Sequence, residues 1–109
     1  MPMFARVCEL HFKTEKKADL IRMLREEIVP MLQACDGFVD EIALDLDTHP
    51  RKFYAISLWS DARDAERYQK ECFPKIYDML EPFLMAPISV KHGTIDETIT
   101  KKLIVGVAA

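Results

Sequence analysis

Residues 53–61 read FYAISLWSD, a stretch that indicates a strand followed directly by a helix. Its first seven residues are rich in aromatic and β-branched side chains and predict a strand, and Ser60 or Asp61 can cap a helix directly after it. Side chains alternate between the two faces of a strand, so Phe53 and Trp59 share one face. The other face carries three further large apolar residues, Tyr54, Ile56 and Leu58. We therefore expect both faces of this strand to be buried.

Similar patterns extend in both directions along the chain. Alternation predicts strands over residues 3–12 and 38–47, and a further strand over 88–95. Apolar residues at three-to-four spacing predict one helix between Thr14, its expected cap, and Gly37, with a kink at Pro30. A second helix follows Asp61, and Pro74 should divide it. Residues 98–105 could form a short fifth strand.

The order of these elements is strand, helix, strand, strand, helix, strand. This order predicts one α+β domain over residues 1–109 with the ferredoxin-like split βαβ arrangement and an antiparallel sheet. Two helices cover only one face of such a sheet. We expect the second face to pack on the same face of another copy, which gives a homodimeric α/β barrel.

Composition excludes several classes of protein. The net charge of −3 provides no basic stripe, so we expect no nucleic-acid partner. Three cysteines without a CxxC pair fit neither a disulfide framework nor a zinc site, and indicate reduced thiols. The N-terminus lacks a signal-peptide pattern, and the C-terminal LIVGVAA is too short to span a bilayer. We therefore expect no membrane association and place the protein in the cytoplasm.

Four stretches resemble the antibiotic-biosynthesis-monooxygenase-like family of dimeric α/β-barrel proteins. They are GFVDEIALDLD (37–47), FYAISLWSDARDAERY (53–68), CFPKIYDMLEPFL (72–84) and APISVKHGTI (86–95). The resemblance implies the ferredoxin-like fold and a range of activities that includes cofactor-independent oxygenation of aromatic molecules. The haem-degrading members resemble the chain at Trp59. They also use a histidine in the second helix, and residues 61–84 contain none.

Trp59 is the first candidate for ligand binding, because its flat ring can stack on an aromatic molecule. Ala55 and Ser57 are small residues between Trp59 and Phe53 on the same face, and they leave space for a ligand. Tyr68, on the following helix, offers a phenol that could orient it. Packing without a ligand is the alternative for the tryptophan and the tyrosine.

Histidines supply the candidates for catalysis. His92 lies in the fourth strand with apolar neighbours on its face, where it could accept a proton, and we prefer it to His11. A structural role is the alternative for both. Asp45, Asp47 and His49 have metal-like spacing in a turn, but turns are polar for ordinary reasons, and we expect no metal. Two further residues, Arg6 and Asp40, could form an internal ion pair or line a pocket.

These observations favour a monooxygenase-like protein that acts on or binds a small apolar or aromatic molecule without a cofactor. The alternative is a non-catalytic ligand-binding or stress-associated protein of the same fold. Whether the chain is an enzyme is left open by its residues.

Overall fold

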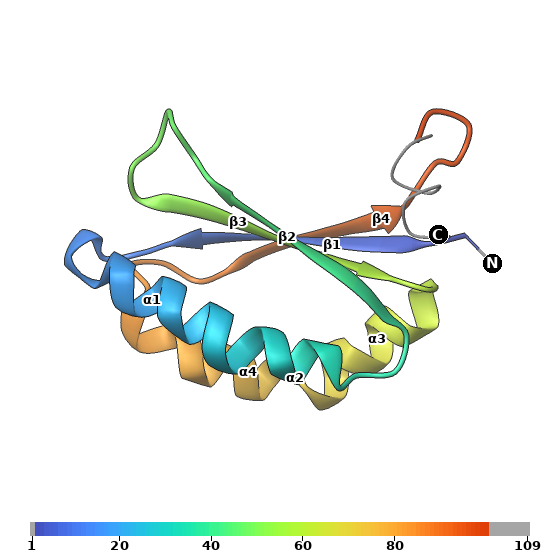
Figure 1. Cartoon of the computed structure of the whole chain (residues 1–109), viewed down its shortest axis with the longest axis horizontal. Coiled ribbons are helices and arrows are strands. Elements are labelled where there is room, and N and C mark those ends of the chain that lie inside the picture. The colour runs from blue at the N-terminus through green and yellow to red at the C-terminus, as the bar shows by residue number, and fades with distance from the viewer. Residues whose placement is uncertain (1, 101–109) are drawn as a thin grey trace.

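The computed structural model describes residues 2–100 and contains a four-stranded antiparallel sheet. The strands are β1 (Phe4–His11), β2 (Phe38–Asp45), β3 (Lys52–Trp59) and β4 (Ser89–Thr94), and their order across the sheet is β2-β3-β1-β4. All helices lie on one side of the sheet (Figure 1). The predicted ferredoxin-like α+β arrangement is therefore confirmed.

The first helical region runs from η1 (Thr14–Lys16) through α1 (Lys17–Met23) and η2 (Leu24–Ile28) to α2 (Val29–Gln33). Thr14 lies inside the opening 3-10 turn and caps nothing, so its predicted role was wrong. The segment η2 is a π-helix. It ends two residues before Pro30, which has no N–H to continue the regular α-helical ladder, and the predicted irregularity at Pro30 is thus a local widening of the preceding turn.

Gly37 ends this region with a φ of 81°, a conformation that favours glycine. A Cβ at this position would also collide with the side chain of Asp64. The Gly37 carbonyl accepts a hydrogen bond of 2.8 Å from the Ser60 N–H, which joins this turn to the end of β3.

The second helical region follows β3 as α3 (Ala62–Glu71), α4 (Phe73–Leu80) and η3 (Glu81–Phe83). The Asp61 side chain caps α3 by accepting a hydrogen bond of 3.0 Å from the Asp64 N–H. The break between α3 and α4 falls just before Pro74, as the sequence predicts. Residues 97–99 form a turn, and the rest of the expected fifth strand lies outside the described residues.

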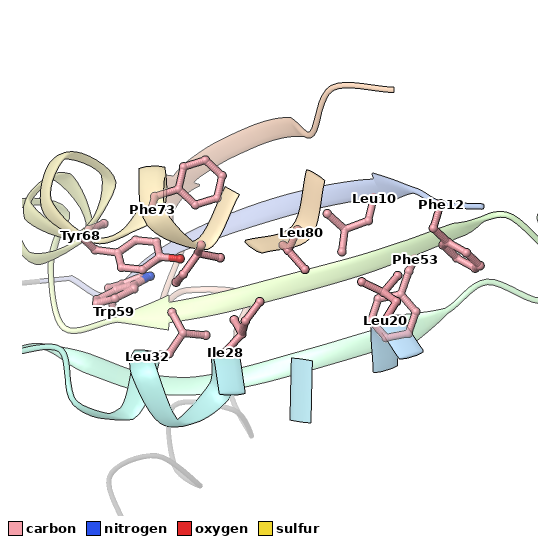
Figure 2. Close-up of a cluster of buried hydrophobic side chains, with 12 residues drawn as sticks. Leu10, Phe12, Leu20, Ile28, Leu32, Phe53, Trp59, Tyr68, Phe73 and Leu80 are labelled. Atoms are coloured by element: carbon pink, nitrogen blue, oxygen red, sulfur yellow. The ribbon is translucent and has the colours of Figure 1, made fainter. Parts of the chain in front are cut away.

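The core lies between the sheet and the helices. At one end of β3 it is aromatic, with Trp59, Tyr68 and Phe73 grouped together (Figure 2). At the other end the residues are mainly aliphatic and surround Phe53: Leu10, Phe12, Leu20 and Leu80. The face of β3 that meets the helices is thus the one with Phe53 and Trp59.

A β-bulge in β2 corrects one detail of the predicted strand. Alternation places Phe38 on the same face as Ile42 and Leu44, with Glu41 on the opposite face. The pairing register of β2 with β3 shifts between Phe38 and Asp40, so Phe38 and Glu41 both face the helices. Ile42 and Leu44 lie on the far face, where they are 36% and 42% exposed.

Candidate functional site

Polar side chains form a row across all four strands on the helix-facing side of the sheet. Arg6 of β1 pairs with Ser57 of β3 and with His92 of β4, and Ser57 pairs in turn with Glu41 of β2. Directly paired residues point to the same face of a sheet. We call Glu41, Ser57, Arg6 and His92 the polar row.

Arg6 is the most deeply buried charged residue of the row, with 2% of its surface exposed. Its guanidinium carbon lies 4.9 Å from the ring centroid of Tyr68 and 4.7 Å from that of Phe73. Neither terminal nitrogen, Nη1 or Nη2, has a hydrogen-bond partner among the described residues. Burial of an unpaired cation is costly, and the two aromatic faces offset only part of the cost. The site therefore favours an anionic group close to Arg6.

Glu41 is the second unpaired group of the row, since its Oε2 atom is buried without a hydrogen-bond partner. The pKa of Glu41 rises from the ordinary 4.5 to about 8, chiefly through burial and secondly through the charge of Asp40, whereas Arg6 acts in the opposite direction. A carboxyl group with a pKa near neutrality can both accept and release a proton under physiological conditions.

The aromatic side chains at one end of the core pack against Ser57 and Arg6, the two middle residues of the polar row. Trp59 is fully buried, and its Nε1–H donates a hydrogen bond of 2.9 Å to the Ser57 Oγ. The Tyr68 ring lies against Trp59 with 4.8 Å between the centroids and a tilt of 33° between the ring planes, and Figure 2 shows the two side chains next to each other. Burial is the main cause of a raised pKa for the Tyr68 hydroxyl, so it keeps its proton. Trp59 is thus a packed residue that also positions Ser57.

Two spaces with shared wall residues lie beside the Glu41 end of the row. A small inner cavity of about 40 Å³ is lined by Cys8, Glu41, Ala55, Ser57 and Tyr68, together with core leucines and isoleucines. A cleft of about 340 Å³ runs between the first helical region and strands β2 and β3, and Phe53, Ala55 and Glu41 contribute to its walls. Because Glu41 and Ala55 line both spaces, the carboxyl lies where a ligand from the cleft would meet the inner cavity. The volume suits a small organic molecule.

His92 lies apart from these spaces. It is exposed on the edge strand β4, its ring lies 5.4 Å from that of Phe4, and it lines a separate groove of about 340 Å³ together with Arg6 and Gln69. The structure therefore brings Ala55, Ser57, Phe53 and Tyr68 to the cleft and inner cavity. It separates His92 from them by the width of β1.

Other polar candidates have different surroundings. Asp45 forms an ion pair of 2.7 Å with Lys17. Across residues 2–100, no three His, Cys, Asp or Glu side chains lie together as metal ligands would. The Asp40 side chain accepts a hydrogen bond from the Glu41 N–H, and the ion pair that Arg6 and Asp40 could have formed is not present. As the other possibility predicts, both line pockets: Asp40 the cleft and Arg6 the groove beside His92.

Sequence reasoning missed Glu41 as a site residue. Strict alternation along β2 separates Glu41 from the apolar residues of its strand, as expected for a solvated carboxylate, and only the bulge turns it inward. The charged Arg6 among apolar residues of β1 was a usable signal, but its lack of a partner is visible only in three dimensions.

Among residues 2–100, no helix has the length and apolar character needed to cross a membrane. No protein-family model and no curated protein sequence matches the chain.

Several solved structures share its fold at low sequence identity. One from Bordetella bronchiseptica is described as a "Putative antibiotic biosynthesis monooxygenase"; it has a TM-score of 0.76 and 12% identity, and the match covers 88% of this chain and 99% of that chain. One from Caulobacter crescentus with the same description has a TM-score of 0.75 and 11% identity, with 88% and 92% covered. A Nitrosomonas europaea protein of unknown function has a TM-score of 0.75 and 17% identity, with 94% of each chain covered. The chain therefore has the ferredoxin-like fold of structures described as "putative antibiotic biosynthesis monooxygenase".

Proposed function

We propose that this protein binds a small planar aromatic molecule with an ionisable hydroxyl group and acts on it as a monooxygenase-like enzyme without a cofactor. The observation that carries the proposal is the pair of unpartnered groups, Glu41 and Arg6, in one row on the helix-facing side of the sheet. Glu41 lines the cleft, and Arg6 lies on the far side of Ser57 from it, where it lines the groove beside His92. The similarity in fold to proteins described as monooxygenases agrees with it. Cytoplasmic location is part of the proposal, since the three cysteines are free.

The proposed roles follow from charge and position. In its ionised form the Glu41 carboxylate accepts the proton of the ligand hydroxyl, and the Arg6 guanidinium stabilises the resulting phenolate. The electron-rich phenolate then reduces dioxygen: one oxygen atom is added to the ring and the other leaves as water. A phenol and dioxygen thus give a quinone and water, with all the electrons supplied by the ligand. Ser57, held by Trp59, can orient the bound oxygen by a hydrogen bond.

The alternative function, ligand binding without catalysis, uses the same cleft. The two are separated by measuring oxygen consumption and tryptophan fluorescence on the same panel of phenols and hydroxynaphthalenes. Because Trp59 is the only tryptophan, its fluorescence reports ligand binding directly. Saturable quenching with oxygen uptake supports the enzyme, and quenching without uptake supports the binding protein. If no compound of the panel causes either saturable quenching or oxygen uptake, the proposed site is refuted.

Substitution of Glu41 tests the mechanism. We expect Glu41→Gln to abolish oxygen uptake while ligand quenching persists, because the amide keeps the shape of the carboxyl but accepts no proton. Uptake by the native protein should rise with pH up to about 8, where Glu41 becomes ionised. His92→Gln is the matched comparison. If His92→Gln abolishes uptake and Glu41→Gln does not, the proton acceptor is His92, as the sequence predicts.

We also propose that the protein is a homodimer through the sheet face opposite the helices. This face is uncovered in the single chain (Figure 1) and carries Ile42, Leu44, Ile56 and Val7. Burial of such a face in a stable dimer should remove more than about 1,000 Å² of surface from water. Sedimentation at micromolar concentration should give the mass of a dimer, and Ile42→Lys should give a monomer. A monomeric native protein would contradict the proposal.

A further inference from the structure

Two cysteines far apart in the sequence meet on the helical side of the molecule. Cys35 follows α2 and Cys72 lies between α3 and α4, and their sulfur atoms are 3.5 Å apart. The Cys35 Sγ also lies 3.3 Å from the Met31 carbonyl, to which its S–H donates. In the contact between the two sulfur atoms either thiol can be the donor. The two thiols are therefore held side by side by the backbone of two different helical regions.

The pair is open to reagents from outside. Both cysteines are only partly buried, and both line a surface groove of about 400 Å³ that also includes Asp64 and Arg67. Cys8, the third cysteine, belongs instead to the helix-facing side of β1 and lines the inner cavity. Oxidation by a small molecule in solution should therefore distinguish Cys35 and Cys72 from Cys8.

We propose that Cys35 and Cys72 form a reversible disulfide bond when the protein meets a small-molecule disulfide. In the first step one thiol loses its proton and its sulfur attacks the reagent, which releases one reduced thiol and leaves a mixed disulfide. In the second step the neighbouring sulfur displaces the remaining reagent thiol. Two S–H bonds are broken and one S–S bond forms, and the two electrons reduce the reagent to two thiols.

The approach required of the two sulfur atoms is short. A disulfide bond brings them from 3.5 Å to about 2.0 Å. Burial, and then the hydrogen bond with Cys72, raise the pKa of Cys35 to about 11. The raised pKa lowers the fraction of Cys35 that is present as the thiolate at neutral pH, so attack by the Cys35 sulfur is slow.

The bond would connect two parts of the helical layer. Thirty-seven positions separate the two cysteines, so the bond closes a long loop and restricts the unfolded chain. Cys72 also donates its backbone N–H to the Tyr68 carbonyl at 2.9 Å, and Tyr68 lines both the groove and the inner cavity. Oxidation on the surface is thus adjacent to a wall of the inner cavity.

The test is independent of any ligand or activity. The native protein is equilibrated in mixtures of reduced and oxidised glutathione, the thiols are blocked, and intact mass and peptide maps are recorded. We expect a blocking group on Cys8 alone, so that the mass is lower than that of the blocked reduced protein by two blocking groups and two hydrogen atoms. We also expect a linked pair of peptides that contain Cys35 and Cys72, and a melting temperature that rises by several degrees until a reductant is added. Cys8→Ser should behave like the native protein.

Cys35→Ser and Cys72→Ser complete the test. Each should lose the change in mass and the rise in melting temperature, while each retains a glutathione adduct on the remaining cysteine of the pair. The proposal is overturned if the native protein forms only glutathione adducts, or only bonds that involve Cys8.

Discussion

Replacement of Glu41 by glutamine should change how the stability of the protein depends on pH. The folded protein holds the pKa of Glu41 at about 8, whereas the unfolded chain returns it to the ordinary 4.5. Between these values the unfolded chain has lost the proton and the folded protein has kept it. Stability therefore falls as pH rises through this window, by up to about 1.4 kcal/mol per pH unit. The full pKa difference corresponds to roughly 5 kcal/mol, and partial solvent exposure of the side chain lowers our expectation to about 3–5 kcal/mol.

Glutamine resembles the protonated carboxyl in shape and carries no proton to lose. The native protein and Glu41→Gln should therefore be equally stable near pH 4.5, and the variant should be more stable above pH 8 by the amount just given. Urea denaturation at equal protein concentration across this range measures the difference. Glu27→Gln, on the exposed side of η2, changes the net charge equally and controls for long-range effects. If the difference in free energy of unfolding between the native protein and Glu41→Gln did not change with pH, the burial of this carboxyl would be refuted.

Three further substitutions test the packing around the site by urea denaturation. Gly37→Ala should destabilise the protein by roughly 2–4 kcal/mol, because alanine would have to adopt a left-handed backbone and its Cβ would collide with Asp64. A loss of unfolding free energy no larger than that of an ordinary surface substitution would contradict this reasoning. Ser57→Ala should cost about 1–3 kcal/mol, since the indole N–H of Trp59 would be left buried without an acceptor. Trp59→Ala should cost about 3–5 kcal/mol through the cavity that it leaves, and an unchanged stability would mean that the indole is not packed.

The fold was accessible from the sequence because its boundaries are set by local chemistry. Asp61 can cap a helix wherever it precedes one, Gly37 tolerates the left-handed conformation, and Pro74 cannot continue a helix. Each of these signals depends on a few neighbouring residues. The order of strands and helices then follows, and few topologies accommodate it.

The site was less accessible, because its properties depend on residues that are distant in the sequence. Whether Arg6 has a hydrogen-bond partner depends on every group that surrounds it in the folded protein. The contact of Cys35 with Cys72 likewise requires two separate helical regions to pack together. The small residues Ala55 and Ser57 were a readable signal for space beside β3, and both line the inner cavity. His92 was predicted from the apolar neighbours on its own strand, and these neighbours do not show how far His92 lies from the cleft.

The bulge at the start of β2 sets two properties of the molecule with one extra residue. It turns Glu41 toward the helices and, by the same rotation, turns Ile42 and Leu44 outward. If the pairing register of β2 shifted by one residue, Ile42 and Leu44 would turn toward the helices and Glu41 would turn outward. The interior would lose its carboxyl group, and the outer face would lose its apolar side chains. The inward position of Glu41 and the apolar side chains of the outer face therefore depend on the same bulge, and a single insertion or deletion before Glu41 would change both at once.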